Sequence, residues 1–365
     1  MPFATEPAFA HGQSTSPGTA ILLCNLGTPD EPTPTAVRRY LKEFLGDPRV
    51  VEIPRVIWWL ILNLVILRVR PKASAAKYAS VWTPEGSPLK VWSDKQASLL
   101  EGYLGERGHR VMVRAAMRYG TPSIPTVLDA MKAAGIARVL VLPLFPQYSG
   151  TTTACFSDAV YGWSQRIRSL PEFRFVNRYH DDPGYIGALA KKVSDQWAAS
   201  GHPERLVLSF HGVPKRTLLL GDAYHCECMK TARLLGERLG LEQGRLLVTF
   251  QSRLGKAEWL QPYTEPTLVA LAVQGVKRVD VMCPGFTSDC LETLEEIAIE
   301  AREAFLHAGG TQFNYITCLN DQHQWIDALS AIAARHLQGW DTGASVDATA
   351  LATQRERALA LGAEA

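Results

Sequence analysis

Short apolar runs, spaced widely along the chain, limit the fold of this sequence more than any other feature. There are eight such runs of five to eight residues, and most spacers between them hold 25 or more residues. Continuous rather than alternating apolar residues are typical of strands covered on both faces. The spacers leave room for crossover helices, so the pattern predicts an α/β fold with parallel sheets. The predicted strands are Ala20–Leu26, Val111–Met117, Arg138–Phe145, Phe173–Tyr179, Leu206–Phe210, Leu246–Phe250, Val279–Cys283 and Phe313–Cys318.

The predicted strands divide into two similar sets of four, which indicates two lobes. Gly135 precedes a strand that opens at Arg138, and Gly275 precedes one that opens at Arg278. This shared spacing favours a duplicated Rossmann-like lobe. We therefore expect two four-stranded parallel sheets flanked by helices, whose strand ends face a central cleft where ligands bind. The expected ranges are 1–18 for an N-terminal extension, 19–165 and 166–320 for the lobes, 321–337 for a helix packing back on the first lobe, and 338–365 for a poorly ordered tail.

The charge balance and the missing fingerprints argue against several classes of function. The net charge of +2 is too small for a basic field, so nucleic acid is not an expected partner. No G-x-G-x-x-G follows a strand and no G-x-x-x-x-G-K-[ST] is present, which disfavours a nicotinamide or nucleotide enzyme. The seven scattered cysteines, an odd number, indicate free thiols in a reducing cytoplasm, and residues 1–19 lack the pattern of a secretory signal.

One apolar run raises the question of membrane contact. Val56–Leu67 contains 12 residues, fewer than the ~20 that a spanning helix needs. Arg55 precedes the run, and Arg68, Arg70 and Lys72 follow it. Two interpretations remain: a buried core helix, or an apolar lip that contacts lipid or an apolar substrate, with the basic residues at the headgroups. The run by itself favours the core helix.

A histidine ends the fifth predicted strand. His211 is followed by Gly212, so its ring is expected to point into the cleft. Histidine titrates near neutrality and can accept a proton or bind a metal. A hydrogen-bonded structural histidine is the alternative, and position alone does not separate the two.

A row of glutamates follows the seventh predicted strand. We expect a helix from Cys290 to about His307, on which Glu292, Glu296 and Glu300 lie at i, i+4 and i+8. The spacing alone favours a solvated face, and Asp289 with Glu292 fits a capping box. A functional row would have to face the cleft and would need cations or protons to offset its own repulsion.

These residues together resemble the ferrochelatase family, enzymes that insert Fe(II) into protoporphyrin IX to make haem. The resemblance runs from Ile21 to about Leu337, and the order and spacing of its motifs make it specific. The motifs are Asn25–Pro29, Gly86–Lys90, Leu144–Ser149, Ser209–Pro214, Phe250–Arg253 with Trp259 and Leu260, and Phe286–Leu294.

The resemblance implies a role for each candidate residue. It implies that His211 takes pyrrole protons or binds the metal, and that Glu292 is the active-site carboxylate. Glu296 and Glu300 match acidic positions thought to guide metal or protons, which favours a functional path over a solvated face. It also places Val56–Leu67 at the lip of the active site, which reverses the preference for a core helix. The residues expected to line the porphyrin pocket are Leu26, Tyr148, Trp259, Phe286 and Cys290.

The chain departs from some family members at its cysteines. Cys290 stands where some members have a second active-site histidine, so a mechanism that requires such a pair is not expected here. No cysteine follows Cys318 and Gly150 follows Ser149, so the [2Fe–2S] cluster of some relatives is not expected. Cys226 and Cys228 lie beside His225 but lack a second C-x-x-C partner, and any metal they bind is left open.

The resemblance therefore implies Fe(II) and protoporphyrin IX as substrates, with no further cofactor required. It also implies a cytoplasmic enzyme with peripheral contact at the inner face of the membrane, and an upstream enzyme that supplies the porphyrin. Two alternatives remain: a coproporphyrin ferrochelatase, and a tetrapyrrole or haem carrier without turnover. A carrier would not need His211 together with Glu292.

Overall fold

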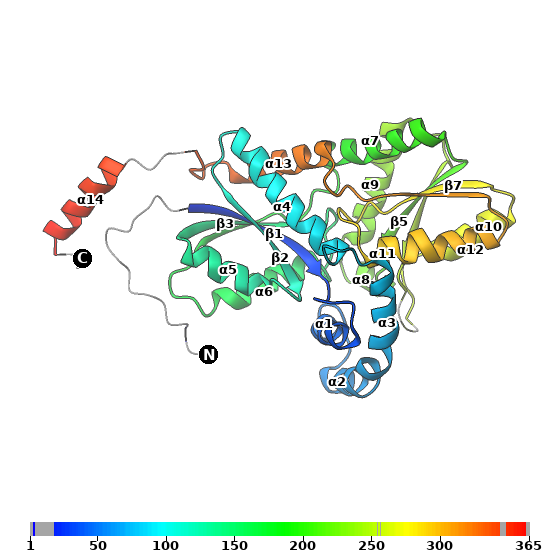
Figure 1. The fold of residues 1–365 in the computed structure, drawn as a ribbon, viewed down its shortest axis with the longest axis horizontal. Coiled ribbons are helices and arrows are strands. Elements are labelled where there is room, and N and C mark those ends of the chain that lie inside the picture. The colour runs from blue at the N-terminus through cyan, green and yellow to red at the C-terminus, as the bar shows by residue number, and fades with distance from the viewer. Residues whose placement is uncertain (1–2, 4–17, 254, 256, 344–347, 363–365) are drawn as a thin grey trace.

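The computed structural model describes Phe3 and residues 18–253, 255, 257–343 and 348–362. It contains two parallel four-stranded sheets with matching orders, β2-β1-β3-β4 and β6-β5-β7-β8, which confirms the predicted fold class (Figure 1). The expected N-terminal extension, 1–18, lies outside the described residues apart from Phe3 and Gly18. The strands are β1 (Gly18–Gly27), β2 (Met112–Tyr119), β3 (Ile136–Pro143), β4 (Glu172–Phe175), β5 (Arg205–His211), β6 (Leu246–Gln251), β7 (Arg278–Met282) and β8 (Gln312–Ile316).

Helices connect the strands and cover the sheets. In two places a helix contains a π-helical turn, labelled η, and the helical elements follow here in chain order. They are α1 (Pro34–Gly46), α2 (Arg55–Ile61), η1 (Leu62–Ile66), α3 (Leu67–Val81), α4 (Pro88–Glu106), α5 (Ile124–Ala133), α6 (Thr153–Ser164), α7 (Pro183–Ser200), α8 (Lys215–Leu219), α9 (Tyr224–Leu239), α10 (Thr264–Val273), α11 (Leu291–Leu294), η2 (Glu296–Ala301), α12 (Arg302–His307), α13 (His323–Leu337) and α14 (Ala348–Ala360).

The helix ends follow from local sequence. At the start of α7 the Asp182 carboxylate accepts hydrogen bonds from the N–H groups of Gly184 and Tyr185, and Pro183 occupies the first turn. Such caps satisfy N–H groups that have no partner within the helix. At the end of α9, Gly240 adopts the left-handed conformation with φ 63°, which costs glycine little because it has no Cβ.

Strand β4 corrects the expected boundary between the lobes. It pairs in parallel with β3, with Arg138 opposite Glu172 and Val141 opposite Phe175. The first sheet therefore continues past residue 165, where the first lobe was expected to end. The grouping of the predicted strands into four and four agrees with this pairing, whereas the boundary at residue 165 does not.

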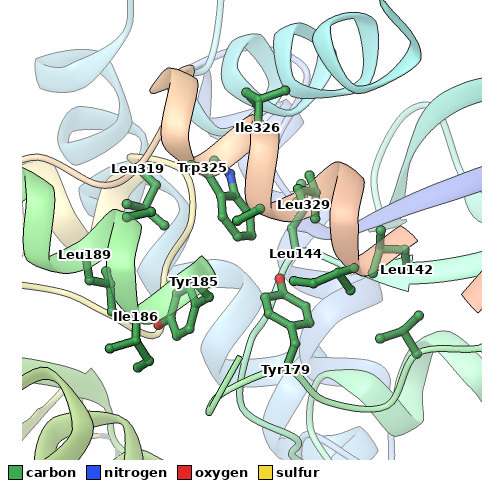
Figure 2. Packing of buried hydrophobic residues seen from close by; sticks show 14 of the residues in the cluster. Leu142, Leu144, Tyr179, Tyr185, Ile186, Leu189, Leu319, Trp325, Ile326 and Leu329 are labelled. Atoms are coloured by element: carbon green, nitrogen blue, oxygen red, sulfur yellow. The ribbon is translucent and has the colours of Figure 1, made fainter. Parts of the chain in front are cut away.

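One helical layer joins the two sheets. Within it α4 contacts α13, α13 contacts α7, and α7 contacts α9, and these helices form a row across the molecule in Figure 1. Their buried side chains share a single cluster with Ile21 of β1 and Leu208 of β5. Figure 2 shows Trp325 of α13 among Tyr179 and Tyr185, with both tyrosine rings about 6 Å from it. The helix expected at 321–337 thus contacts both lobes rather than the first alone.

The segment that follows α1 projects from the first lobe beside α11 (Figure 1). We call α2, η1 and α3, residues 55–81, the lip segment. Trp58, Leu62 and Leu67 form one small buried cluster with Leu45 of α1. The other side of the same run is open to solvent, with Val56 77% and Trp59 60% exposed. The run is therefore part core and part exposed apolar surface.

The C-terminal region contains a helix that the sequence interpretation did not include. Within the range 338–365, expected to be poorly ordered, α14 forms a helix that stands apart from the sheets in Figure 1. Residues 344–347 and 363–365 of that range lie outside the described residues. Every helix in the described part of the chain is too short or too polar to cross a bilayer.

Candidate active site

A cavity of about 560 Å³ opens at the carboxyl ends of the strands, where open α/β sheets bind their ligands. Its walls come from the ends of β1 and β5, from the loops after β3, β6 and β7, and from the lip segment. Eight of the nine site residues predicted from the sequence line it. They are Leu26, His211, Trp259, Phe286, Cys290, Glu292, Glu296 and Glu300.

The backbone beside His211 sets its tautomer. Its Nδ1 lies 2.6 Å from the carbonyl oxygen of Gly212. A carbonyl only accepts hydrogen bonds, so Nδ1 carries a hydrogen, and in the neutral ring Nε2 keeps the lone pair. The half-buried ring lies 6.4 Å from that of Phe286, measured between centroids. The histidine is thus prepared to accept a proton or to ligate a metal through Nε2.

Gly212 allows Trp259 to approach the strand end closely. A Cβ on Gly212 would lie 2.6 Å from the Gln251 carbonyl oxygen and 3.1 Å from Cε3 of Trp259. Leu260 donates its N–H to the carbonyl of Val213 at 3.0 Å, which fixes the tryptophan loop beside this strand. Within the described part of the chain, the buried indole N–H of Trp259 has no hydrogen-bond partner. It is a donor that a ligand could satisfy.

The glutamate row lies on a helix with a π-helical turn in its middle, rather than on the regular helix that the spacing predicted. The N–H of Glu300 donates to the carbonyl of Glu295 at 2.9 Å, a bond across five residues. Such turns contain one extra residue and occur often at functional sites. Glu296 accepts from the N–H of Ser252 at 2.7 Å and from the amide of Gln251 at 3.3 Å. Its carboxylate therefore faces the loop after β6.

The start of this helix also differs from the expected capping box. The N-cap is Cys290, whose N–H donates to Thr293 Oγ1 at 3.0 Å, and not Asp289. Asp289 is buried and accepts hydrogen bonds from Tyr315 at 2.5 Å and Asn320 at 2.6 Å. Because this carboxylate is already satisfied, it acts as a structural anchor at the end of β7. Burial, followed by the nearby charge of Glu292, raises the pKa of the Cys290 thiol well above its usual value.

Sequence reasoning missed an ion pair at the outer end of the row. Lys77 of α3 donates to Glu300 at 2.7 Å and contacts Glu295 at 2.9 Å. Burial disfavours the Lys77 ammonium, but the two carboxylates outweigh it and its pKa is raised. Burial also raises the pKa of Glu295, against the opposing effect of Lys77. No spacing rule could have found Glu295, because the π-helical turn brings it beside Glu300.

Two tyrosines were also missed. Tyr40 of α1 and Tyr78 of α3 line the cavity, and the Tyr40 hydroxyl donates to the Gly27 carbonyl at 3.1 Å. Burial is the main cause that raises the pKa of both phenols, with a further contribution from the charge of Glu292. Both hydroxyls therefore remain protonated donors next to that carboxylate. Tyr78 belongs to no motif that the sequence interpretation used.

Tyr148 is the predicted pocket residue that does not line the cavity. Its ring lies 5.3 Å from the Arg178 guanidinium, and its N–H donates to the Glu227 carboxylate at 2.7 Å. Its neighbours Gln147 and Ser149 line the cavity instead. The Tyr148 side chain thus lies beside Arg178 rather than in the cavity, while the side chains on either side of it reach the cavity.

The two cysteines beside His225 are in different environments. Cys226 is exposed on α9 and Cys228 is buried, and all seven cysteines of the chain are free. The His225 ring stacks on Phe250 instead. Within the described ranges, no group of three or more His, Cys, Asp or Glu is arranged to hold a metal ion.

Comparison with known proteins gives this geometry its context. The family model for ferrochelatase matches residues 18–337. The protein named ferrochelatase from Methylibium petroleiphilum is 68% identical over the full length of both chains, and that from a Polaromonas species is 66% identical over the same span. The solved structure of SirB from Bacillus subtilis with Fe3+ has a TM-score of 0.52 at 15% identity, covering 72% of this chain and 96% of that one, which shows a shared fold. The chain belongs to the ferrochelatase family.

Proposed function

We propose that this enzyme of haem biosynthesis inserts Fe(II) into protoporphyrin IX, with His211 and the glutamate row as its working groups. One observation carries the proposal: a single cavity is lined both by a histidine whose Nε2 keeps a lone pair and by a row of carboxylates. The reaction needs both, because two pyrrole protons leave the porphyrin as the metal enters.

The proposed roles follow from the chemistry of each group. His211 Nε2 accepts a pyrrole proton, since the other ring nitrogen already holds a hydrogen against the Gly212 carbonyl. Glu292 receives protons or metal next, and Glu296 and Glu300 continue the row toward solvent, where Glu300 is exposed. A hard divalent cation is bound weakly when only a few carboxylates coordinate it at once, so it can be released again. The row can therefore deliver a metal that the porphyrin then takes.

The lining favours a porphyrin with two carboxylates over one with four. Among the residues that the structure describes, three cations line the cavity, Arg70, Lys77 and Arg253, and Lys77 is already paired with two glutamates. The guanidinium of Arg253 lies 5.3 Å from the ring of Tyr263. Arg70 and Arg253 thus leave two guanidinium groups for two propionates, and the unpartnered N–H of Trp259 supplies another donor.

The test is an anaerobic assay with Fe(II) and either protoporphyrin IX or coproporphyrin III, run side by side. We expect rapid conversion of the protoporphyrin spectrum to that of haem and slower conversion of coproporphyrin. Faster turnover of coproporphyrin would contradict the assignment of substrate. Binding of porphyrin without any acceleration over a protein-free control would indicate a carrier and would overturn the enzymatic proposal.

We also propose peripheral contact with the cytoplasmic face of a membrane through the lip segment. Its exposed apolar residues are Val56, Ile57, Trp59, Leu60, Ile61, Leu64, Val65 and Val69. Arg55, Arg68 and Lys72 are exposed in and beside this surface, as expected for a segment that lies at anionic headgroups. The lip segment also lines the cavity, so a porphyrin released by the preceding enzyme could enter from the membrane side.

A further inference from the structure

Lys77 connects two parts of the molecule that are far apart in sequence. It belongs to α3, in the lip segment of the first lobe. In the second lobe, α11, η2 and α12 form the helix that carries the glutamate row, which we call the acidic helix, and α3 contacts its first part, α11 (Figure 1). Its ammonium nitrogen lies 2.7 Å from Glu300 Oε1 and 2.9 Å from Glu295 Oε1. All three side chains line the cavity. Because the Lys77 and Glu300 side chains are nearly half exposed, this contact lies at the mouth of the cavity.

The two carboxylates face each other because of the π-helical turn. Glu295 has an exposed fraction of only 8%, and without a cation its charge would stand unscreened beside that of Glu300. Glu296 does not share this contact, because its oxygens accept hydrogen bonds from Ser252 and Gln251. Among the described residues, Lys77 is the cation paired with both Glu295 and Glu300, which we call the outer pair.

We infer that Lys77 is a positioning residue that competes with the metal for the outer carboxylate pair. The inference rests on the proposed function of the glutamate row. An incoming divalent cation displaces the ammonium from Glu295 and Glu300, and this displacement removes the ionic contact between α3 and the acidic helix, so that α3 is held there by apolar packing against Leu291. Metal uptake is thereby coupled to opening of the lip segment. The ammonium also prevents the outer pair from holding a metal too tightly to pass it on.

The charge of Lys77 predicts how the KM for Fe(II) and the kcat should change when this residue is replaced. Removal of the Lys77 charge leaves two facing carboxylates, which bind a divalent cation more strongly. The Lys77→Met variant should therefore have a KM for Fe(II) about fivefold to tenfold lower, and a lower kcat because the metal leaves the outer pair slowly. Lys77→Arg keeps the charge and should restore both constants toward wild type. A merely structural loss would lower kcat without lowering the KM for the metal.

The kinetic experiment varies Fe(II) anaerobically at saturating protoporphyrin IX. Lys42→Met is the matched control, because Lys42 is exposed on the neighbouring α1 and the charge change is the same. An unchanged KM for Fe(II) in Lys77→Met, or an equal shift in Lys42→Met, would overturn the inference. An inactive wild-type enzyme would instead contradict the proposed function.

A second measurement needs no turnover. Limited proteolysis of the full chain, with and without Zn²⁺ and without porphyrin, reports the opening of residues 55–81. We expect Zn²⁺ to increase cleavage there in the wild type. In Lys77→Met we expect cleavage that is already high and is insensitive to Zn²⁺. Cleavage of the wild type that does not respond to Zn²⁺, with the variant behaving identically, would overturn the coupling of metal to lip.

Discussion

At the scale of single residues, the backbone around a site residue decides much of what its side chain can do. The carbonyl of Gly212 fixes the tautomer of His211, and the absent side chain of Gly212 lets Trp259 pack against the same strand end. Gly27 is a similar case at the end of β1, with φ +119° and a hypothetical Cβ only 1.8 Å from the Tyr119 carbonyl oxygen. The cavity wall therefore depends on two glycines that contribute no chemistry.

Replacement of His211 should separate binding from turnover. We expect His211→Ala to lose at least about a hundredfold in kcat, since general-base catalysis contributes on that order. Binding of protoporphyrin IX, followed by quenching of its fluorescence, should change little because the apolar lining remains. Phe286→Leu is a useful comparison, as it alters the ring beside His211 without removing a base. Equal turnover of His211→Ala and wild type would remove His211 from the mechanism.

Asp280 of β7 should give the stability a pH dependence. Burial raises its pKa above the ordinary value of 3.8, although hydrogen bonds from Asn314 and Trp197 oppose the shift. The folded protein thus binds a proton that the unfolded chain has already lost. The stability contributed by this group is complete below the ordinary pKa and is lost as pH rises through the raised one.

The Asp280→Asn variant carries no charge at this position, so its stability relative to wild type should increase as the pH rises above the ordinary pKa of 3.8. Chemical unfolding of both proteins at a series of such pH values measures the difference. Asp195→Asn, on the exposed face of α7, serves as the control and should show no such trend. A wild-type-to-variant difference that stays constant with pH would contradict the assignment.

At the scale of elements, the π-helical turn η2 decides which carboxylates of the helix lie side by side. It places Glu295 beside Glu300 and turns Glu296 toward Ser252. The extra residue that forms such a turn can be removed without changing the composition of the row. The geometry of the metal path is therefore open to test separately from its charge.

Deletion of Ala298 should convert η2 to a regular α-helix. Every later residue would then rotate by about 100° relative to Glu292. We expect kcat/KM for Fe(II) to fall at least about tenfold, while the thermal unfolding midpoint changes little or rises. Ala298→Ser keeps the length and should retain activity. A deletion variant with wild-type kinetics would show that the turn has no part in the reaction.

Adjacent tryptophans in α2 should have opposite effects. Trp58 is 8% exposed and donates to the Leu45 carbonyl at 2.6 Å, whereas Trp59 faces solvent. Trp59→Glu should reduce co-sedimentation with anionic liposomes roughly tenfold without loss of stability, since one exposed aromatic ring contributes about 1.4 kcal/mol or more to such contact. Trp58→Glu should instead lower stability. Unchanged liposome binding of Trp59→Glu would argue against membrane contact through this face.

At the scale of the whole molecule, the two lobes share one buried cluster, and each sheet also has a cluster of its own on its other face. The helical layer of α4, α13, α7 and α9 covers both sheets, and Trp325 lies within it, fully buried (Figure 2). The shared cluster covers one face of each sheet, so neither lobe keeps its full core without the other, unlike ordinary independent domains. The lobes should accordingly unfold together.

Trp325→Ala should destabilise the protein by about 3–5 kcal/mol, as truncation of a buried tryptophan usually does. The loss should appear in a single transition, seen at the same denaturant concentration by circular dichroism and by fluorescence. Trp59→Ala, at an exposed position, should change the free energy of unfolding by less than about 0.5 kcal/mol. Two separate transitions in the wild type would show that the lobes are independent.

Features that depend on local sequence could be predicted, whereas features that depend on partners distant in the sequence could not. All eight strands were identified, because a continuous apolar run is a local signal of a strand buried on both faces. The place of β4, the outward turn of Tyr148 and the pairing of Glu295 with Lys77 depend on partners distant in sequence. Similarly, a π-helical turn differs from an α-helix by one residue, which the spacing of Glu292, Glu296 and Glu300 does not reveal. The functional roles of the site residues remain predictions.

The lip segment has small buried clusters of its own, formed with α1 and separate from the shared core. A segment that packs on itself can be exchanged as a cassette. Transplanting residues 34–81 from a relative with a different porphyrin or membrane preference should transfer that preference. Tyr40, Lys77 and Tyr78 travel with the segment, whereas His211 and the glutamate row stay unchanged. In such an enzyme, changes in porphyrin or membrane preference can accumulate in one part of the gene, and changes in the residues that carry out metal insertion in another.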